Sequence, residues 1–355
     1  MSTVNSVLMA NVTIGLDLGD RTSRTYEVDA AGQCVREDTV PTTPSGVKRY
    51  FGNRGRCRVV LEVGTHSPWV ARELERLGHE VIVGNPSEMY AHGRRRRRND
   101  RLDAQFLARQ GRADPMLVYP IRHRRETAQQ DLAVLRARDQ LVAVRTKLIN
   151  HVRGAVKSLG SRLPSCSADA FPQRVAGELP ELLQPALRPL LEVITDLTRR
   201  IRGADTTLAK LVRERYPVAQ QLQQPAGVGP LTALAFVLLV DDPHRFRHSR
   251  AVGPYFGLVP RLDESSDSQP QLRIAKTGDA LGRRLLVSAA QYILGPFGPE
   301  CDLRRFGLTI AQRGGKNAKK RAVIAVARKL AVLLHQLWVS GTPYDPDYQL
   351  KRRAA

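Results

Sequence analysis

The chain has 355 residues, 42% of them hydrophobic, which is enough for two or three globular domains with real cores. It has no run of about 18 apolar residues, so we expect no transmembrane helix, and its N-terminus lacks the charged start of a secretory signal. Lys and Arg total 56 against 34 acidic residues, and the resulting charge of +22 indicates a polyanionic partner, of which nucleic acid is the usual one.

Two further kinds of partner for this positive charge fit the sequence less well. An anionic membrane surface would require an amphipathic anchor, which the sequence lacks, and a ribosomal-type structural role would not account for the carboxylates described below. The four cysteines are scattered without a CxxC pair. Their scatter argues against a zinc site and predicts a reducing, cytoplasmic compartment.

The N-terminal third alternates strand and helix patterns, which predicts a mixed α/β sheet. Asp17 ends the first apolar strand and Glu62 lies in the third, while residues 30–33 form the turn of a hairpin between the first two strands. Predicted strands cover residues 12–18, 25–29, 58–63 and 80–84, and predicted helices cover residues 45–51, 66–79 and 100–110.

Asp100 and Asp103 begin the last of these helices, three residues apart and therefore on one face. A block of arginines precedes them. Five like charges in a row are usually disordered when free and often form a solvated linker, but beside two carboxylates they favour binding of nucleic-acid phosphates, with a strong salt dependence. The block comprises Arg94, Arg95, Arg96, Arg97 and Arg98.

From about residue 125, apolar residues recur at helical spacing over two long stretches. The first runs from Leu135 to Leu159 with basic residues between the apolar positions, and the second runs from Leu187 to Leu211. A segment rich in Ser and Pro, residues 161–172, separates them. The pattern predicts two antiparallel helices that form a coiled-coil arm for dimerisation, or else a plain intramolecular helix pair.

Gly227 and Gly229 precede an apolar helix in QPAGVGPLTALAFVLLV, and this stretch resembles the hairpin of a helix-hairpin-helix motif. Glycine allows positive φ and lets backbone N–H groups approach phosphate closely. An ordinary glycine turn before a core helix has the same sequence, so both interpretations stay open.

The C-terminal part then shows a polar loop followed by a basic turn at Lys276 and another helix. A last helix at residues 317–339 begins with Lys319 and Lys320 and turns apolar. These three lysines are candidate phosphate contacts. The loop holds Ser265 and Ser266, and a serine in a polar loop is most often simply solvated.

Asp17, Glu62, Asp100 and Asp103 are the candidate metal ligands. A charged residue in or at the end of an apolar strand is costly to bury unless it is paired or bound to metal. Together, four hard oxygen donors suit one or two Mg²⁺ or Mn²⁺ ions, which stabilise the oxygens of phosphoryl transfer. Each acid alone also has an ordinary role. Asp17 could cap a turn, Glu62 could satisfy backbone amides, Asp100 could be the N-cap of its helix, and Asp103 could pair with an arginine.

The motifs IGLDLG, VLEVGTHSPW and NDRLDAQFLA resemble the three N-terminal motifs of the insertion-sequence-110 family of transposases. These are the DEDD transposases, or bridge-RNA-guided recombinases, and they are related to the pilin-gene invertases. QPAGVGPLTALAFV, FGLVPRLDESS, IAKTGDALGRRLLVSAA and AVARKL resemble the family's transposase domain. The resemblance covers nearly the whole chain, in order.

The resemblance implies an RNase H-like (Holliday-junction-resolvase-like) domain whose four acids fall on Asp17, Glu62, Asp100 and Asp103. It also implies a nucleophilic serine after the GL-x-P motif, which aligns with Ser265. Ser266 stands where the family commonly has Gly and remains a second candidate. Leu272 also replaces a common Gly.

As further consequences, the resemblance implies a recombinase of an insertion sequence with donor and target DNA as substrates. An element-encoded bridge RNA would guide it, and a dimer or tetramer would assemble through the arm. The expected domains are residues 1–122 with the acids, 123–217 as the arm, 218–341 as the transposase domain with the serine, and 342–355 as a basic tail.

Two other functions remain open on the sequence. A metal-only nuclease of the Holliday-junction-resolvase type would use the acids to activate water and leave Ser265 without a role. A non-catalytic nucleic-acid-binding relative would bind with steep salt dependence and transfer no strands.

Overall fold

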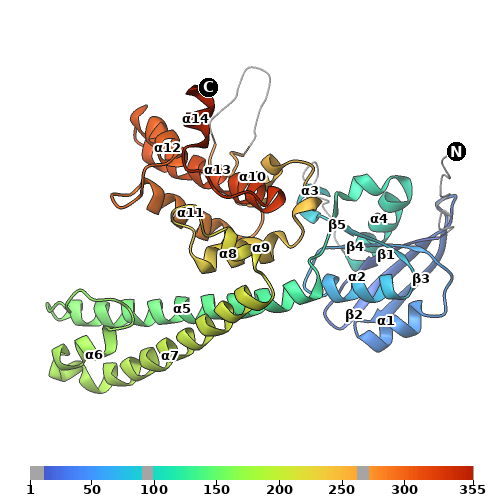
Figure 1. The fold of residues 1–355 in the computed structure, drawn as a ribbon. Helices are drawn as coiled ribbons and strands as arrows, with labels where there is room; N and C mark the ends of the chain where they lie inside the picture. Colours follow the sequence, from blue (N-terminus) through green and yellow to red (C-terminus); the bar gives the residue numbers. More distant parts are fainter. Residues whose placement is uncertain (1–11, 90–98, 262–271, 355) are drawn as a thin grey trace. The chain divides into compact units, whose positions relative to one another are not determined.

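The chain divides into two compact units, which Figure 1 colours from blue to red along the sequence. The computed structural model describes residues 12–89, 99–261 and 272–354. The first unit covers residues 1–124 and the second covers residues 125–355. Each unit has a hydrophobic core of its own.

The first unit is built on a six-stranded mixed sheet with the strand order β3-β2-β1-β4-β5-β6. Strands β1, β4 and β5 run parallel, whereas β2, β3 and β6 run antiparallel to their neighbours. This arrangement confirms the predicted mixed α/β sheet. The strands are β1 (Thr13–Asp17), β2 (Thr22–Val28), β3 (Cys34–Pro41), β4 (Arg58–Glu62), β5 (Glu80–Gly84) and β6 (Pro120–Ile121).

Helices cover both faces of this sheet, α1 and α2 on one face and α4 on the other (Figure 1). Side chains alternate along a strand. Ile14 and Leu16 therefore point to the same side and pack against α1 and α2, whereas Gly15 and Val60 face α4. The helices are α1 (Pro44–Phe51), α2 (Ser67–Arg76), α3 (Pro86–Met89) and α4 (Asp100–Ala113).

Helix α4 lies so close to β1 that only glycine fits at position 15. A Cβ on Gly15 would lie 1.9 Å from the carbonyl oxygen of Ala104 and 2.5 Å from the backbone nitrogen of Ala108. Near the other end of the helix, a Cβ on Gly111 would lie 2.3 Å from Cγ2 of Val60. Small residues on both elements thus fix α4 across β1 and β4.

The predicted position of the hairpin turn was wrong, and strand β3 was not predicted at all. Strand β2 pairs with β1 as predicted, but the turn at residues 30–33 joins β2 to β3, which the sequence pattern does not predict. Most residues of β3 are exposed because it is the edge strand of the sheet. A strand with little buried surface shows no apolar alternation, so its sequence resembles a polar loop.

The second unit is helical, and its two longest helices, α5 and α7, lie side by side as a hairpin that we call the arm (Figure 1). The arm confirms the two long helices predicted from the apolar spacing. The helices of the unit are α5 (Glu126–Ser158), α6 (Phe171–Val175), α7 (Gln184–Glu214), α8 (Val218–Gln221), α9 (Pro230–Val240), α10 (Val252–Tyr255), α11 (Ala280–Leu294), α12 (Asp302–Gln312), α13 (Ala318–Ser340) and α14 (Tyr348–Ala354).

The arm has a separate core at each end. Near its base, Leu135 of α5 and Leu208 of α7 belong to the core formed with the C-terminal helices. Toward the tip, Val156 and Ile194 pack around Phe171 of α6 in a second cluster. Many of the apolar positions are therefore packed within one chain, as expected of an intramolecular helix pair, although Leu159 at the end of the first stretch is 51% exposed.

Hydrogen bonds between arginines and acids close the base of the arm and join it to the C-terminal helices. Asp131 of α5, only 5% exposed, accepts hydrogen bonds from Arg215 at 3.0 Å and from the hydroxyl of Tyr216 at 2.7 Å. Arg136 of α5 donates to Asp279, the N-cap of α11, at 2.7 Å. Several basic residues of the arm thus have structural partners and are not all available to a polyanion.

Helix α13 is long and apolar enough to cross a membrane by length and composition, with a mean hydropathy of 1.5 over its most apolar window. Its residues Val326, Leu330 and Leu334 are fully buried in the main core of the second unit. The helix spans Ala318–Ser340, close to the predicted 317–339. Packing in the core accounts for its hydropathy.

We predict that Gly15→Ala lowers the free energy of unfolding by about 3 kcal/mol, because the new methyl group meets backbone atoms of α4 that cannot rotate away. The matched control is Gly154→Ala on α5, where an added Cβ meets nothing within 4 Å; there alanine should stabilise the helix by about 1 kcal/mol. Urea denaturation of both variants tests this expectation. Equal midpoints for Gly15→Ala and the wild type would contradict it.

Candidate active site

Asp17 and Glu62 lie at the carboxyl ends of two neighbouring strands. Strands β1 and β4 pair in parallel, and these two acids are their last residues. Each follows by two positions a residue that packs against α4, namely Gly15 and Val60. Because side chains alternate along a strand, both carboxylates leave the sheet on the face that α4 covers.

Helix α4 brings a third acid to the same place. Arg58, at the start of β4, donates from Nη1 to the carbonyl oxygen of Gly111 near the end of α4, at 3.0 Å. The helix therefore runs opposite to β4, and its first turn lies toward the carboxyl ends of the strands. Asp103, in that first turn, precedes by one residue the Ala104 backbone that contacts β1. We call the place shared by Asp17, Glu62 and Asp103 the carboxylate edge.

The carboxylate edge has one feature expected of a cation site. Oδ1 of Asp103 is buried and accepts no hydrogen bond from any described residue. A buried carboxylate oxygen without a donor is costly, and a cation would offset that cost. Within residues 12–89, 99–261 and 272–354, however, no three His, Cys, Asp or Glu side chains gather closely enough to hold a metal ion.

Asp100 differs from Asp103 in position. It is exposed at the first residue of α4, and the helix is capped by Asn99, whose side chain accepts from the backbone N–H of Leu102 at 2.8 Å. The interpretation of Asp100 as the N-cap is therefore wrong by one residue. Both acids also lie where negative charge stabilises the helix dipole, which gives each a role in helix stability.

Two polar side chains that the sequence patterns do not single out lie on the loops that extend β1 and β4. Nε2 of His66, after β4, lies 3.6 Å from Oδ1 of Asp20, after β1. The sequence signal was a histidine three residues before Trp69, at the start of α2. His66 lies close to Asp20 only because β1 pairs with β4, and no local sequence pattern predicts that pairing.

The candidate nucleophiles Ser265 and Ser266 lie outside the described residues, but both ends of their loop are described. The backbone N–H of Arg261 donates to the carbonyl of Arg273 at 2.9 Å. An isolated antiparallel bridge joins the same two segments. The described residues on either side of the two serines are therefore held side by side.

Lys276 follows this loop in a strained backbone conformation. It is exposed and has φ of +57°, a region that favours glycine. The neighbouring backbone leaves little freedom, since a Cβ on Gly257 would lie 2.2 Å from the carbonyl oxygen of Thr277. A lysine kept where glycine would relieve strain is consistent with a functional ammonium group.

The two glycines before α9 have different environments. Gly227 has φ of +78°, and a Cβ there would lie 2.7 Å from the carbonyl oxygen of Ala289 on α11. Gly229 caps α9, and a Cβ there would meet nothing within 4 Å. Core packing is therefore enough to require glycine at 227, whereas the backbone at 229 is open to approach.

Lys319 and Lys320 are exposed in the first turn of α13. No ion pair among the described residues involves either of them. Positive charge at a helix N-terminus is unfavourable with respect to the helix dipole, so an external anion would stabilise both lysines. The predicted contacts Arg94 to Arg98 lie outside the described residues.

Two protein-family models match the chain, one over the first unit and the beginning of α5 and the other within the second unit. Residues 14–160, which contain the four acids, match the DEDD transposase model of IS110 elements. Residues 219–301, which contain both candidate serines, match the model described as the IS116/IS110/IS902 transposase family. A DEDD transposase domain implies the use of a divalent metal in general.

Relatives match over most of the chain. A transposase for insertion sequence element IS1111A from Coxiella burnetii is 32% identical, with 70% of this chain and 68% of the relative aligned. A probable family 20 transposase from Pseudomonas aeruginosa is 27% identical over 94% of this chain and 98% of the relative. A pilin gene-inverting protein from Moraxella bovis is 23% identical over 84% of this chain and 85% of the relative. With the match in both units, these similarities establish that the chain belongs to the IS110/IS116/IS902 family of transposases.

Proposed function

We propose that the protein is a DNA recombinase that cuts and rejoins strands through a phosphoserine intermediate, with the carboxylate edge as the second half of its active site. The observation that carries the proposal is a buried oxygen of Asp103 that lacks a described hydrogen-bond donor, on a helix whose first turn lies toward the ends of β1 and β4, the strands that end in Asp17 and Glu62. The strand order β3-β2-β1-β4-β5, with β1 between an antiparallel and a parallel neighbour, supports an RNase H-like fold.

Asp17, Glu62 and Asp103 would hold Mg²⁺ or Mn²⁺, with Asp100 as a further ligand at the exposed start of α4. Their oxygens are the donors that such cations prefer. When bound, a divalent cation neutralises charge on the phosphate and lowers the pKa of an attacking hydroxyl. The burial of Asp103 keeps one ligand oxygen away from water in advance of binding.

Ser265 is the proposed nucleophile. Its Oγ attacks a DNA phosphodiester, a bond forms between Oγ and phosphorus, and the bond to one DNA oxygen breaks, so that a DNA hydroxyl leaves with a proton. A hydroxyl of a second strand then attacks the phosphoserine and releases Ser265 with its proton. One phosphodiester is broken and one is made, so no nucleotide triphosphate is consumed.

The two halves of this site belong to different units of the chain, so the reaction requires them to meet, within one protomer or between protomers. Family membership supports a homo-oligomer, a dimer or tetramer assembled through the arm. It also supports an element-encoded bridge RNA that pairs with donor and target DNA. In that case the protein recognises the shape of the nucleic-acid backbone, and base pairing with the RNA recognises the DNA sequence.

The binding surface for nucleic acid is proposed to include Lys276, Lys319, Lys320 and the open backbone at Gly229, together with the arginine block at residues 94–98. Lys276 has a strained backbone conformation. The positive charges of Lys319 and Lys320 at the N-terminus of α13 interact unfavourably with the helix dipole. A net charge of +22 supports the same assignment.

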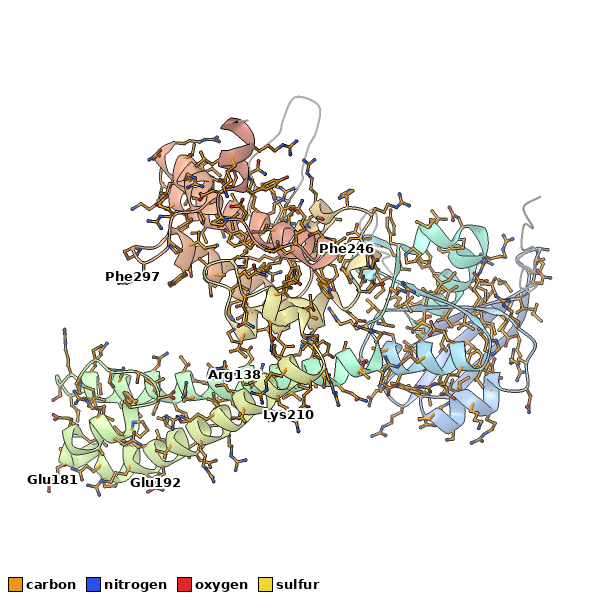
Figure 2. All side chains as sticks on the ribbon, in the orientation of Figure 1. Arg138, Glu181, Glu192, Lys210, Phe246 and Phe297 are labelled. Atoms are coloured by element: carbon orange, nitrogen blue, oxygen red, sulfur yellow. The ribbon has the colours of Figure 1, made fainter. Side chains whose placement is uncertain are left out.

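We expect Asp103→Asn to lower strand transfer between donor and target plasmids by about 100-fold or more, because the amide cannot hold a cation as the carboxylate does. Excess EDTA should abolish the wild-type reaction. Glu192→Gln, on the arm (Figure 2), is the charge-matched control and should leave activity unchanged. Full activity of Asp103→Asn at unchanged DNA affinity would refute the metal assignment.

Ser265→Ala should eliminate the covalent protein–DNA adduct that denaturing gels detect with end-labelled DNA. Ser266→Ala, its neighbour in the same loop, is the control and should retain the adduct. The reverse pattern would move the nucleophile to Ser266. An enzyme that cuts DNA normally without any adduct would be a metal-dependent nuclease instead.

Lys276→Gly should separate binding from folding. Glycine relieves the left-handed strain and should raise the free energy of unfolding by up to about 1 kcal/mol. Loss of the ammonium should lower the slope of log DNA affinity against log salt by about 1. Lys276→Asn, which tolerates this backbone region, should show the same affinity loss, and wild-type affinity in both variants would exclude the contact.

A further inference from the structure

His66 joins the loops that extend the two acid-bearing strands. It lies between β4, which ends at Glu62, and α2, and its Nε2 is 3.6 Å from Oδ1 of Asp20 in the loop after Asp17. Because β1 and β4 are adjacent and parallel, both loops leave the sheet at the carboxylate edge. The imidazole therefore lies on the same edge of the sheet as the ends of β1 and β4, and strand pairing alone brings it there.

Trp69 fixes the orientation of this imidazole. The indole Nε1–H donates to Nδ1 of His66 at 3.1 Å, and the two rings are perpendicular. An indole nitrogen only donates, so Nδ1 acts as the acceptor and the neutral ring carries its proton on Nε2. Nε2–H is consequently the donor that faces Asp20 and the loop after β1.

That donor is available to a ligand. The 3.6 Å separation from Asp20 is longer than a hydrogen bond. The side chain of His66 is 29% exposed, and that of Asp20 is 95% exposed, so Asp20 can move away into solvent. His66 is also the residue before the first turn of α2, where the helix dipole favours an anion.

We propose that His66 is a catalytic residue whose Nε2–H donates to a non-bridging oxygen of the scissile phosphate, and that Trp69 is the positioning residue that keeps this proton on Nε2. The inference rests on the proposed function, because it names a phosphate contact for that same site. The ring supplies an N–H donor on the loop that follows β4, close to the loop that follows β1. A donor of this kind stabilises charge on phosphate oxygens without pairing with the acids themselves.

The test measures the rate of covalent adduct formation in single turnover with the full-length protein, Mg²⁺, guide RNA and donor DNA, and measures DNA affinity separately. His66→Leu should lower the rate about 100-fold, the usual effect of removing one transition-state donor, with DNA affinity within about threefold. His66→Gln keeps an N–H donor, so its rate should be about tenfold higher than that of His66→Leu.

Trp69→Phe separates positioning from packing, since it keeps an aromatic ring and removes only the indole N–H. It should lower the rate about tenfold, the effect of a lost neutral hydrogen bond, while thermal unfolding stays cooperative. His151→Leu, at an exposed position of α5, is the matched control and should have the wild-type rate.

Three outcomes would overturn the inference and are distinct from failure of the proposed function. A His66→Leu rate within twofold of wild type, with Asp103→Asn inactive, would remove His66 from the site and leave the recombinase assignment standing. A Gln variant no faster than the Leu variant would exclude the donor role. An equal loss of DNA affinity and rate would make His66 a general binding residue. A wild-type protein that forms no adduct would refute the proposed function itself.

Discussion

The candidate site depends on a contact between two backbones, that of α4 against that of β1 at Gly15. A side chain at this position would lie within 1.9 Å of a carbonyl oxygen of α4, so the helix can take this place only over glycine. The contact sets how far the first turn of α4 lies from the ends of β1 and β4. It thereby decides whether Asp103 shares a surface with Asp17 and Glu62 or points to solvent.

The acids at this edge differ in how firmly the fold holds them. Asp103 is half-buried, and one of its oxygens lacks a described donor, whereas Asp100 is exposed one turn earlier. A helix can place two acids three residues apart on one face, but only the acid nearer the sheet is shielded from solvent. Asp103 is thus the acid that links folding and chemistry most closely.

Part of the positive charge has a structural role, and part is proposed to bind nucleic acid. On the arm, arginine and acid pairs such as Arg138 with Asp205 hold α5 to α7, and Arg215 with Asp131 closes the base. These guanidinium groups have carboxylate partners within the chain. Lys276, Lys319 and Lys320 are different, because a strained backbone or an opposing helix dipole makes their positions unfavourable unless an anion is bound.

Much of the fold followed from the sequence because local patterns carried it. Apolar runs and helical spacing were enough for β1, β4, β5, α4, α13 and the two arm helices, and acids that interrupt apolar strands indicated Asp17 and Glu62. The edge strand β3 was not predicted, because its mostly exposed residues show no alternation of apolar and polar side chains. Family motifs, rather than any spacing rule, are the basis for proposing Ser265 as the nucleophile and for proposing a guide RNA.

What the tertiary structure alone decided is which of these residues meet. The pairing of β1 with β4, about 45 residues apart in sequence, puts Asp17 beside Glu62 and brings Asp20 to His66. Helix α4 reaches them by running back across the sheet, and Asn99 rather than Asp100 turns out to cap it. The sequence determines the kind of side chain at each position, but distances between positions arise from strand pairing and close packing, which act between segments that no local pattern connects.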